Sequence, residues 1–206
     1  MRVHVASRNA KKLEEMFRIL EPLVPGVEVV GLDEVDHYDE PVEDAPTFAG
    51  NALIKARAGF AATGLPTVAD DSGICVDALN GMPGVLSARW SGPPKSDERN
   101  NELLLAQLAD VPDERRGAHF TCVVAFVHAD GPDGELVVEG RMDGSVIREV
   151  RGSGGFGYDV LFVPEETPGR TAAELSVAEK DAISHRGRAL RDLAPRVAEI
   201  LAGRHS

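Results

Sequence analysis

The sequence of 206 residues predicts an α/β fold in which a mixed β-sheet is flanked by helices. Short β-prone runs alternate with apolar residues at helical spacing, first at residues 3–6 and 11–20. Residues 119–128 and 135–142 are the strongest strand-like runs and predict a hairpin, and two helical stretches end the chain. This mixed order implies the mixed sheet flanked by helices. No internal repeat or long linker separates independently folding units, so we expect a single domain over residues 1–206, two-lobed with a central cleft.

The first part of the chain predicts a strand, a polar turn and a helix, followed by a second strand at residues 27–32. The next stretch, as far as Asp44, is rich in acidic residues and by itself indicates a solvated loop. Thr47 is a suitable N-cap for a helix with one apolar face, and Gly64 is a suitable end for that helix.

Further elements follow from turn signals and from β-prone or helical runs. They are extended chain at 74–79, a helix at 96–108, a hairpin turn at 130–134 and strands at 146–150 and 158–163. Ser176 and Glu179 form a capping-box pattern, which indicates the start of the first of the two last helices. The second runs to about Ala202.

Composition limits both the ligands and the compartment. Acidic residues outnumber basic ones by 34 to 22, and the net charge of -12 opposes binding to nucleic acid or to an anionic membrane surface. An anionic ligand therefore needs local cations or a metal. Cys75 and Cys122 each lie in an apolar strand-like run, which favours buried thiols in a reducing compartment. No run approaches the ~20 apolar residues of a membrane span or resembles a signal peptide, so we expect a cytoplasmic protein without membrane attachment.

The turn between the first strand and the first helix is a candidate phosphate site. Its residues are Ser7, Arg8, Asn9, Ala10, Lys11 and Lys12. Free backbone N–H groups and the helix dipole favour phosphate at a helix N-terminus, and the lysines strengthen that interpretation. An ordinary strand-to-helix turn with solvated lysines is the alternative, and the turn alone does not decide between them.

Two adjacent carboxylates, Asp70 and Asp71, follow a buried strand at residues 66–69. We expect them at the end of that strand, where α/β enzymes commonly expose catalytic groups. Adjacent side chains on a strand point to opposite faces, so only one aspartate should face a given cleft. The other is then free to act as a buried structural acceptor. An acidic turn without function is the alternative.

Residues 152–157 satisfy the pattern G-x-G-x-x-G, but the sequence argues against a dinucleotide-binding or kinase function. A Rossmann motif must begin a helix, whereas residues 158–162 are strand-like. The lysine and HRD motifs of a kinase and a Walker A sequence are missing. The remaining interpretation is a flexible loop that holds Phe156, whose ring can stack on a base.

Lys180 lies in the first turn of the helix that begins after Ser176. His185 and Arg186 follow too far along the chain to share the face of Lys180 on one straight helix. Either the helix breaks, with Ser184 capping the next helix, or these cations serve different purposes.

Five segments together resemble, in order and spacing, the inosine triphosphate pyrophosphatase family. They are SRNAKKLEE, TFAGNALIKARA, VADDSGICVDALNGMPGVLSARWSG, GGFGYDVLF and TAAELSVAEKDAISHRGRAL. The resemblance covers nearly the whole chain and is closest to bacterial enzymes acting on XTP, dITP and ITP. It implies a magnesium-dependent hydrolase that converts non-standard purine nucleoside triphosphates to the monophosphate and pyrophosphate, and so cleanses the nucleotide pool. It also suggests a homodimer, for which residues 82–90 are an apolar candidate contact.

The same resemblance implies a role for each matched residue. The turn at residues 7–12 and Lys55 would bind the triphosphate, and Ser72 would contact the substrate. Glu43 and Asp71 would hold Mg²⁺, with Asp71 also the catalytic carboxylate. The purine pocket would consist of Phe156, Gly157, Tyr158, Asp159, Lys180, His185 and Arg186.

The implied chemistry is consistent with these residue types. Magnesium neutralises phosphate charge and lowers the pKa of a bound water, whose proton Asp71 would accept. Attack at the α-phosphorus is implied by the family alone. Lysine and arginine only donate hydrogen bonds, so Lys180 and Arg186 suit a 6-oxo purine and disfavour the 6-amino group of adenine.

Two departures from the family pattern and two rival functions bear on this interpretation. Cys75 lies in a run that usually carries another small or apolar residue, and Val160 stands where the family usually has proline. Valine restores a backbone donor and concerns loop rigidity more than chemistry. A pyrophosphatase of the septum-formation-inhibitor type, acting on modified pyrimidine nucleotides, is disfavoured by residues 180–186. A non-catalytic nucleotide sensor is disfavoured by the presence of both Glu43 and Asp71.

Overall fold

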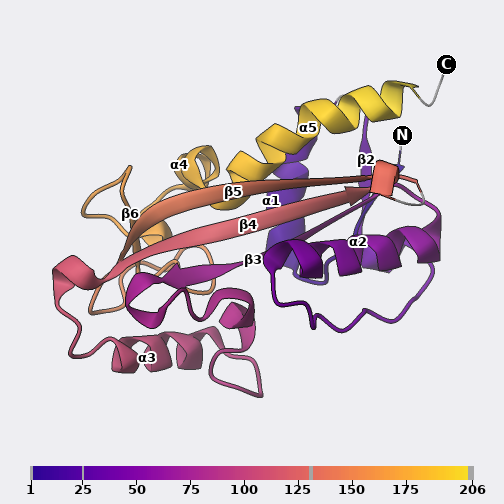
Figure 1. The fold of residues 1–206 in the computed structure, drawn as a ribbon. Coiled ribbons are helices and arrows are strands. Elements are labelled where there is room, and N and C mark those ends of the chain that lie inside the picture. Colours follow the sequence, from indigo (N-terminus) through magenta and orange to yellow (C-terminus); the bar gives the residue numbers. More distant parts are fainter. Residues whose placement is uncertain (1, 25, 130–131, 204–206) are drawn as a thin grey trace. The chain divides into compact units, whose positions relative to one another are not determined.

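The computed structural model describes residues 2–24, 26–129 and 132–203 (Figure 1). Its strands are β1 (Arg2–Val5), β2 (Glu28–Val30), β3 (Thr67–Val76), β4 (Gly117–Val127), β5 (Glu135–Val146) and β6 (Phe162–Pro164). Its α-helices are α1 (Ala10–Leu20), α2 (Phe48–Thr63), α3 (Asp97–Gln107), α4 (Val177–Ile183) and α5 (His185–Gly203). No helix among these residues is long and apolar enough to cross a membrane.

The strands form one hydrogen-bonded sheet in the order β2-β1-β3-β4-β5-β6. Strand β1 is parallel to β2 and β3, whereas β5 and β6 are antiparallel. The predicted α/β class with a mixed sheet flanked by helices is therefore confirmed. That the chain is one two-lobed domain with a central cleft stays a prediction.

The chain divides into two compact units. The first consists of residues 1–71, 122–140 and 186–206, and the second of residues 72–121 and 141–185. Strands β3, β4 and β5 each contribute residues to both units.

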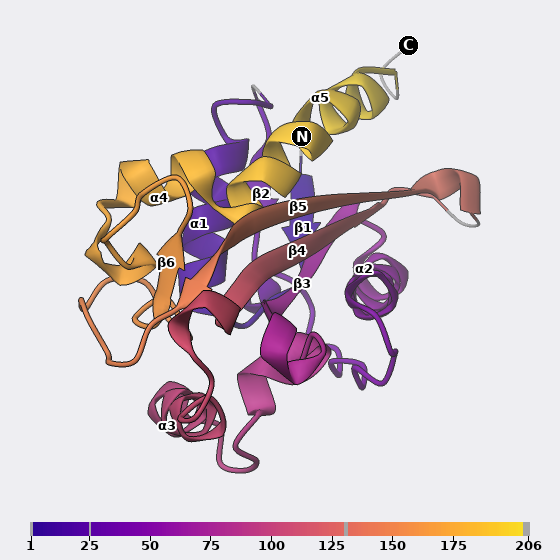
Figure 2. The same ribbon diagram turned by 60° about the vertical axis from the view of Figure 1, so that its left-hand side comes forward.

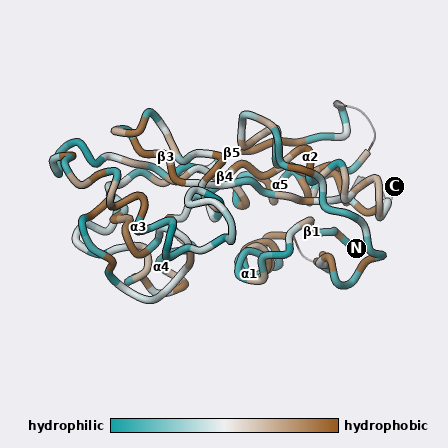
Figure 3. The backbone as a smooth tube through the Cα atoms, turned by 90° about the horizontal axis from the view of Figure 1, so that it is seen from below, coloured by the Kyte–Doolittle hydropathy of each residue, from teal (hydrophilic) through white to brown (hydrophobic). Residues whose placement is uncertain are grey.

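The first unit has a layer of helix on each face of its strands (Figure 2). Side chains alternate along β4: Cys122, Val124 and Phe126 pack with α1 and α5, whereas Val123 and Ala125 pack with α2. This alternation follows from the two-residue period of a strand and explains why β4 is apolar on both faces. Helix α1 combines hydrophobic and hydrophilic segments around its axis, as expected of a helix with one buried face (Figure 3).

The second unit has a single core in which the later part of β3, the beginning of β4 and the end of β5 pack with α3. Leu104 and Leu108, in and just after α3, are fully buried there beside Ile74 and Met142. Tyr158 and Leu161, which follow the glycine-rich loop, complete the same core.

The predicted helix boundaries are largely confirmed. Thr47 caps α2 by accepting from the N–H of Gly50, and Gly64 ends that helix with a positive φ of 66°. Ser176 begins α4 with the predicted capping box. The chain then breaks at Ser184, whose backbone is extended, and α5 begins at His185.

Three strand predictions were wrong in extent. Strand β3 continues through the aspartates to Val76, so Asp70 and Asp71 lie inside a strand and not at its end. Residues 146–150 add no separate strand, because β5 itself runs to Val146. Most of residues 158–163 form turns, and only the end belongs to β6. Part of the predicted hairpin turn at residues 130–134 lies outside the described residues.

Candidate active site

The turn predicted to bind phosphate joins β1 to α1 in the first unit. The side-chain oxygen of Asn9 accepts from the backbone N–H of Lys12 at 3.2 Å, which caps α1. The hydroxyl of Ser7 in turn accepts from the N–H of Asn9 at 3.2 Å. The expected strand, turn and helix are therefore present, and the turn is largely exposed.

A second part of the first unit gathers residues from β3, α2 and the acidic loop. The Nζ of Lys55 lies 3.0 Å from Oε1 of Glu43 and 3.7 Å from Oδ1 of Asp71. Asn51, one turn before Lys55 on α2, donates to Oδ2 of Asp71 at 3.0 Å. The structure thus brings together Glu43, Lys55 and Asp71, which the sequence predicted at one site.

Burial and neighbouring charges shift the pKa values of Asp71 and Lys55. Burial raises the pKa of Asp71, a shift that Lys55 and Asn51 oppose and Glu43 reinforces. Burial by itself would lower the pKa of Lys55, but Asp70, Asp71 and Glu43 together raise it. Lys55 therefore stays charged, while Asp71 becomes a better proton acceptor than an ordinary aspartate.

Asp70 points to the opposite face of β3 and lies in a different network. Its Oδ2 accepts from the Nζ of Lys12 at 3.0 Å and from Nη2 of Arg186 at 3.1 Å. Arg186 also donates to Oε2 of Glu15 at 2.5 Å. Burial would raise the pKa of Asp70, but Lys12 and Arg186 outweigh it and hold that pKa well below the usual range.

Arg186 is only 1% exposed and contacts two carboxylates within the first unit. The sequence placed Arg186 in the purine pocket as a hydrogen-bond donor to the base. Its Nη1 and Nη2 donors are directed at Glu15 and Asp70 in this structure, so reading of the base by Arg186 stays a prediction.

The carboxylates fit a magnesium site whose remaining ligands come from water and substrate. Among the described residues, no group of three or more histidine, cysteine or acidic side chains forms a cage for a metal. Glu43 and Asp71 both direct an oxygen at the Nζ of Lys55, so their negative charge already attracts one cation. Mg²⁺ is commonly held by one or two carboxylates together with substrate phosphates, and these two residues suit that arrangement.

In the second unit, the glycine-rich loop and α4 bring together three of the residues predicted to bind the purine. Oδ2 of Asp159 accepts from the Nζ of Lys180 at 2.6 Å and from the N–H of Phe156 at 2.8 Å. The same Nζ lies 5.1 Å from the centre of the Phe156 ring. Gly155 is required here, because a Cβ would come within 2.1 Å of the Asp159 carboxylate.

Other contacts fix the shape of this loop. Asn101 on α3 donates to the carbonyl of Gly157 at 3.0 Å, and Asp97 accepts from the N–H of Gly157 at 2.8 Å. The side chain of Tyr158 points into the core and donates to the carbonyl of Ser87 at 2.9 Å. Only the backbone of Tyr158 is therefore placed to contact a ligand.

His185 and Ser72, two further predicted residues, also lie in the second unit. His185 is buried and stacks on Phe120, with ring centroids 4.8 Å apart and planes 11° apart. Ser72 follows Asp71 on β3 and is half-buried.

The sequence reasoning missed four polar residues that hold the predicted ones. They are Glu15, Asn51, Asp97 and Asn101. Asn51 lies four residues before Lys55, and this helical spacing was a usable signal that both face the same way. Glu15 carried a weaker signal, since it lies among the buried positions of α1.

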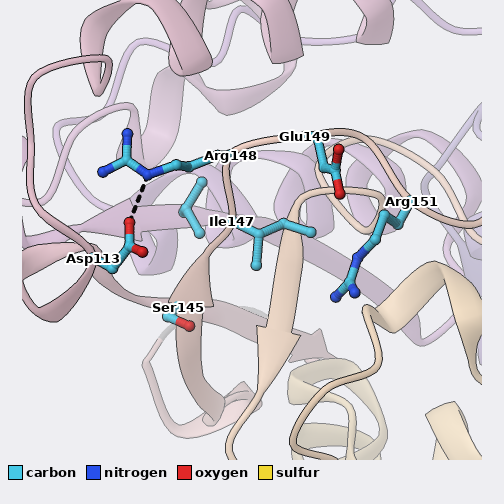
Figure 4. Close-up of a pocket in the computed structure, with 7 residues that line it drawn as sticks. Asp113, Ser145, Ile147, Arg148, Glu149 and Arg151 are labelled. Atoms are coloured by element: carbon cyan, nitrogen blue, oxygen red, sulfur yellow. Dashed lines mark hydrogen bonds and ion pairs between the residues drawn. The ribbon is translucent and has the colours of Figure 1, made fainter.

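A separate cavity of about 350 Å³ lies in the second unit between Asp113, residues 145–149 and Arg151 (Figure 4). Arg148 lines it, but its guanidinium donates to Asp113 and to the carbonyls of Ala109 and Val111. None of the predicted site residues lines this cavity, so we do not assign it to the active site.

Fold and site together define the class of protein. An α/β fold with a lysine-rich turn and with two carboxylates around a lysine suits an enzyme that acts on phosphate compounds. The sequence model of the Ham1 family matches residues 3–196. The chain belongs to the Ham1 family.

Individual relatives are similar over nearly their whole length. A dITP/XTP pyrophosphatase of Nocardia farcinica is 62% identical over 200 residues, which cover 97% of this chain and 96% of that protein. One of Corynebacterium glutamicum is 56% identical over 206 residues, covering 98% and 99%.

Solved structures agree with this assignment. A nucleoside-triphosphatase, also described as a dITP/XTP pyrophosphatase, from Mycobacterium abscessus is 58% identical, with a TM-score of 0.75 and coverage of 95% of this chain and 100% of that one. A HAM1 protein from Coxiella burnetii is 39% identical with a TM-score of 0.86, covering 97% and 99%.

Proposed function

We propose that this chain hydrolyses dITP, XTP and ITP to the nucleoside monophosphate and pyrophosphate, and so removes non-standard purine nucleotides from the pool. The observation that carries the proposal is the convergence of Glu43 and Asp71 on Lys55, in a chain 56–62% identical to dITP/XTP pyrophosphatases. The two carboxylates are suited to bind a metal ion, and the lysine beside them is suited to bind a phosphate.

The proposed mechanism assigns separate tasks to the residues of the first unit. Glu43 and Asp71 hold Mg²⁺, which when bound neutralises phosphate charge and acidifies a water. Lys55 and the turn at residues 7–12 bind the triphosphate oxygens, for which charged donors are favoured. Asp71 accepts the proton of the attacking water.

Asn51 has a supporting task in this mechanism. By donating to Oδ2 of Asp71, it fixes the carboxylate and leaves Oδ1 directed toward Lys55. The carboxylate therefore keeps one orientation while the substrate binds, which lowers the cost of reaching the reactive geometry.

The second unit supplies recognition of the base in this proposal. Phe156 offers a ring face for stacking, and Lys180 beside it is a donor for the 6-oxo group of hypoxanthine or xanthine. Asp159 holds the Nζ of Lys180 in place through the 2.6 Å contact. Adenine presents a 6-amino donor at that position and is disfavoured. We also propose that the protein is a cytoplasmic homodimer, as its family resemblance suggests.

A panel of nucleoside triphosphates, assayed with and without Mg²⁺, tests the proposal. We expect turnover of dITP, XTP and ITP far above that of ATP, abolished by excess chelator. Orthophosphate should appear only when an auxiliary pyrophosphatase is added, because the primary product is pyrophosphate. Full activity in chelator would refute the metal role, and orthophosphate without the auxiliary enzyme would refute the cleavage site.

A further inference from the structure

The loop segment at residues 38–45 carries Glu43 and contains no helix or strand. A carboxylate on an irregular loop keeps a defined position only if the loop is held at other points. The structure shows such contacts on both sides of Glu43, and the first of them involves Tyr38.

Tyr38 forms a hydrogen bond with His4, a fully buried residue of β1. The hydroxyl of Tyr38 lies 2.8 Å from Nε2 of His4, and the two rings meet edge to face with centroids 5.8 Å apart. Nδ1 of His4 lies 3.1 Å from the carbonyl oxygen of Val30, which can only accept. Nδ1 therefore carries the proton, Nε2 is an acceptor, and the Tyr38 hydroxyl donates to it.

Helix α2 has a glycine, Gly59, where His4 and Tyr38 pack against it. A Cβ at Gly59 would lie 3.1 Å from the Tyr38 hydroxyl oxygen and 3.0 Å from Cδ2 of His4. Gly59 therefore leaves the space that the pair occupies. Since Lys55 lies one turn earlier on the same helix, Tyr38 packs beside the element that carries the partner of Glu43.

Two further contacts hold the same segment. Glu40 forms an ion pair with Arg8 of the phosphate turn. The backbone N–H of Ala45 donates to Oδ1 of Asn51 at 3.0 Å, while Nδ2 of the same Asn51 donates to Asp71. Glu43 thus lies between an anchor on β1 and an anchor on α2.

We propose that Tyr38 is a positioning residue for the metal site: its hydrogen bond to His4 holds the segment at residues 38–45 so that Glu43 faces Lys55 and Asp71. The inference rests on the proposed function in that Glu43 is taken as a magnesium ligand. The ion pair of Glu40 competes with substrate, because its partner Arg8 is predicted to bind phosphate. The part-buried contact of Tyr38 with His4 does not depend on substrate.

The variant Tyr38→Phe removes only the hydroxyl and tests the proposal. We expect backbone hydrogen exchange of residues 39–46 to speed up, and Mn²⁺ binding to the protein without substrate to weaken by about 3- to 10-fold, the effect of one lost hydrogen bond. With dITP as substrate, kcat at limiting Mg²⁺ should fall and recover at high Mg²⁺. A general packing defect would not be rescued by the metal.

Tyr158→Phe is the matched control, because Tyr158 is the other tyrosine of the chain and donates to Ser87 in the second unit. It should leave exchange of residues 39–46 and Mn²⁺ affinity unchanged. The double variant His4→Gln with Tyr38→Phe should weaken Mn²⁺ binding little more than Tyr38→Phe alone, since the contact between His4 and Tyr38 is the one that links His4 to the segment at residues 38–45.

Glu43→Gln separates the failure of this inference from that of the proposed function. If Glu43→Gln leaves Mn²⁺ binding intact, Glu43 is not a metal ligand and the proposed function loses its metal site. A different outcome is that Glu43→Gln weakens Mn²⁺ binding, but Tyr38→Phe changes neither Mn²⁺ affinity nor the hydrogen exchange of residues 39–46. In that case only the positioning role of Tyr38 is refuted, and the proposed function stands.

Discussion

The two units differ in how they use charge. In the first unit, Lys12, Lys55 and Arg186 each contact a carboxylate and are largely buried. In the second unit, the buried pair of Lys180 with Asp159 lies beside the ring of Phe156. The first arrangement concentrates cations and anions, and the second combines one cation with an aromatic face.

This difference matches the two halves of a nucleotide. A triphosphate carries several negative charges and needs cations and a metal, whereas a purine base is neutral and needs a flat apolar surface with a few donors. A cluster of buried charges is costly unless every member has a partner. We therefore expect substitutions in the first unit to affect chemistry and stability, and those in the second to affect the choice of base.

The largest expected effect is that of Asp71→Asn. The change keeps the shape of the side chain but removes the charge needed for metal binding and proton transfer, so kcat for dITP should fall by about 1,000-fold or more. Nucleotide binding should remain measurable by calorimetry. Asp70→Asn should be milder in kcat, and an equal loss in both folded variants would contradict the division of roles between the two aspartates.

Asp70→Asn should instead affect stability. It removes the buried carboxylate that Lys12 and Arg186 share and leaves Arg186 with Glu15 alone, and breaking a buried ion pair typically costs about 3–5 kcal/mol. Chemical denaturation of the variant measures the free energy of unfolding. Arg57→Gln, which removes an ion pair with Glu135 at an exposed guanidinium, is the control and should cost no more than about 1 kcal/mol.

Lys180→Met tests the second unit. Loss of the donor to the 6-oxo group should lower kcat/KM for dITP by about 10- to 100-fold while ATP hydrolysis changes little, so the ratio of the two activities falls. Because Lys180→Met also leaves the buried Asp159 carboxylate without its cation, the free energy of unfolding should fall as well, whereas Mn²⁺ affinity should stay near that of the unaltered protein. A parallel fall for both nucleotides would show that Lys180 does not read the base.

Arg186→Ala extends this test to a residue whose predicted role and observed contacts differ. If Arg186 reads the base, the ratio of ITP to ATP activity falls toward one. If it acts only through Asp70 and Glu15, both activities fall together and stability decreases.

The smallest expected effect is a pH dependence of stability due to His4. Burial lowers the pKa of His4 below its ordinary value near 6.5, against the opposing effect of the Val30 carbonyl. Between pH 6.5 and the lowered pKa of the folded chain, the unfolded chain binds a proton that the folded chain does not. The contribution of His4 to stability is therefore full above pH 6.5 and is lost as the pH falls through the lowered folded pKa. Unfolding of His4→Gln measured across this range should show a shallower decline, and an identical pH profile would contradict a neutral, buried His4.

The sequence by itself determined features that depend on near neighbours. Thr47 and Ser176 cap helices as predicted, because a cap acts on backbone groups three residues away. The break at Ser184 was one of the alternatives that residue spacing allowed, and the structure selects it. The α/β class followed from hydrophobic periodicity, which is also a local property.

Strand alternation predicted that Asp70 and Asp71 face opposite ways, and their partners lie accordingly on α1 and α5 or on α2. Alternation left open which aspartate faces which helix; the family resemblance grouped Asp71 with Lys55, and the structure places Asp71 beside α2. Tertiary structure alone decided the continuation of β3 through both charged residues and the pairing of Asp70 with Arg186, 116 positions away. A buried carboxylate in a strand is stable only when cations from other elements neutralise it. The residues next to the carboxylate in the sequence do not indicate which distant residues those cations are.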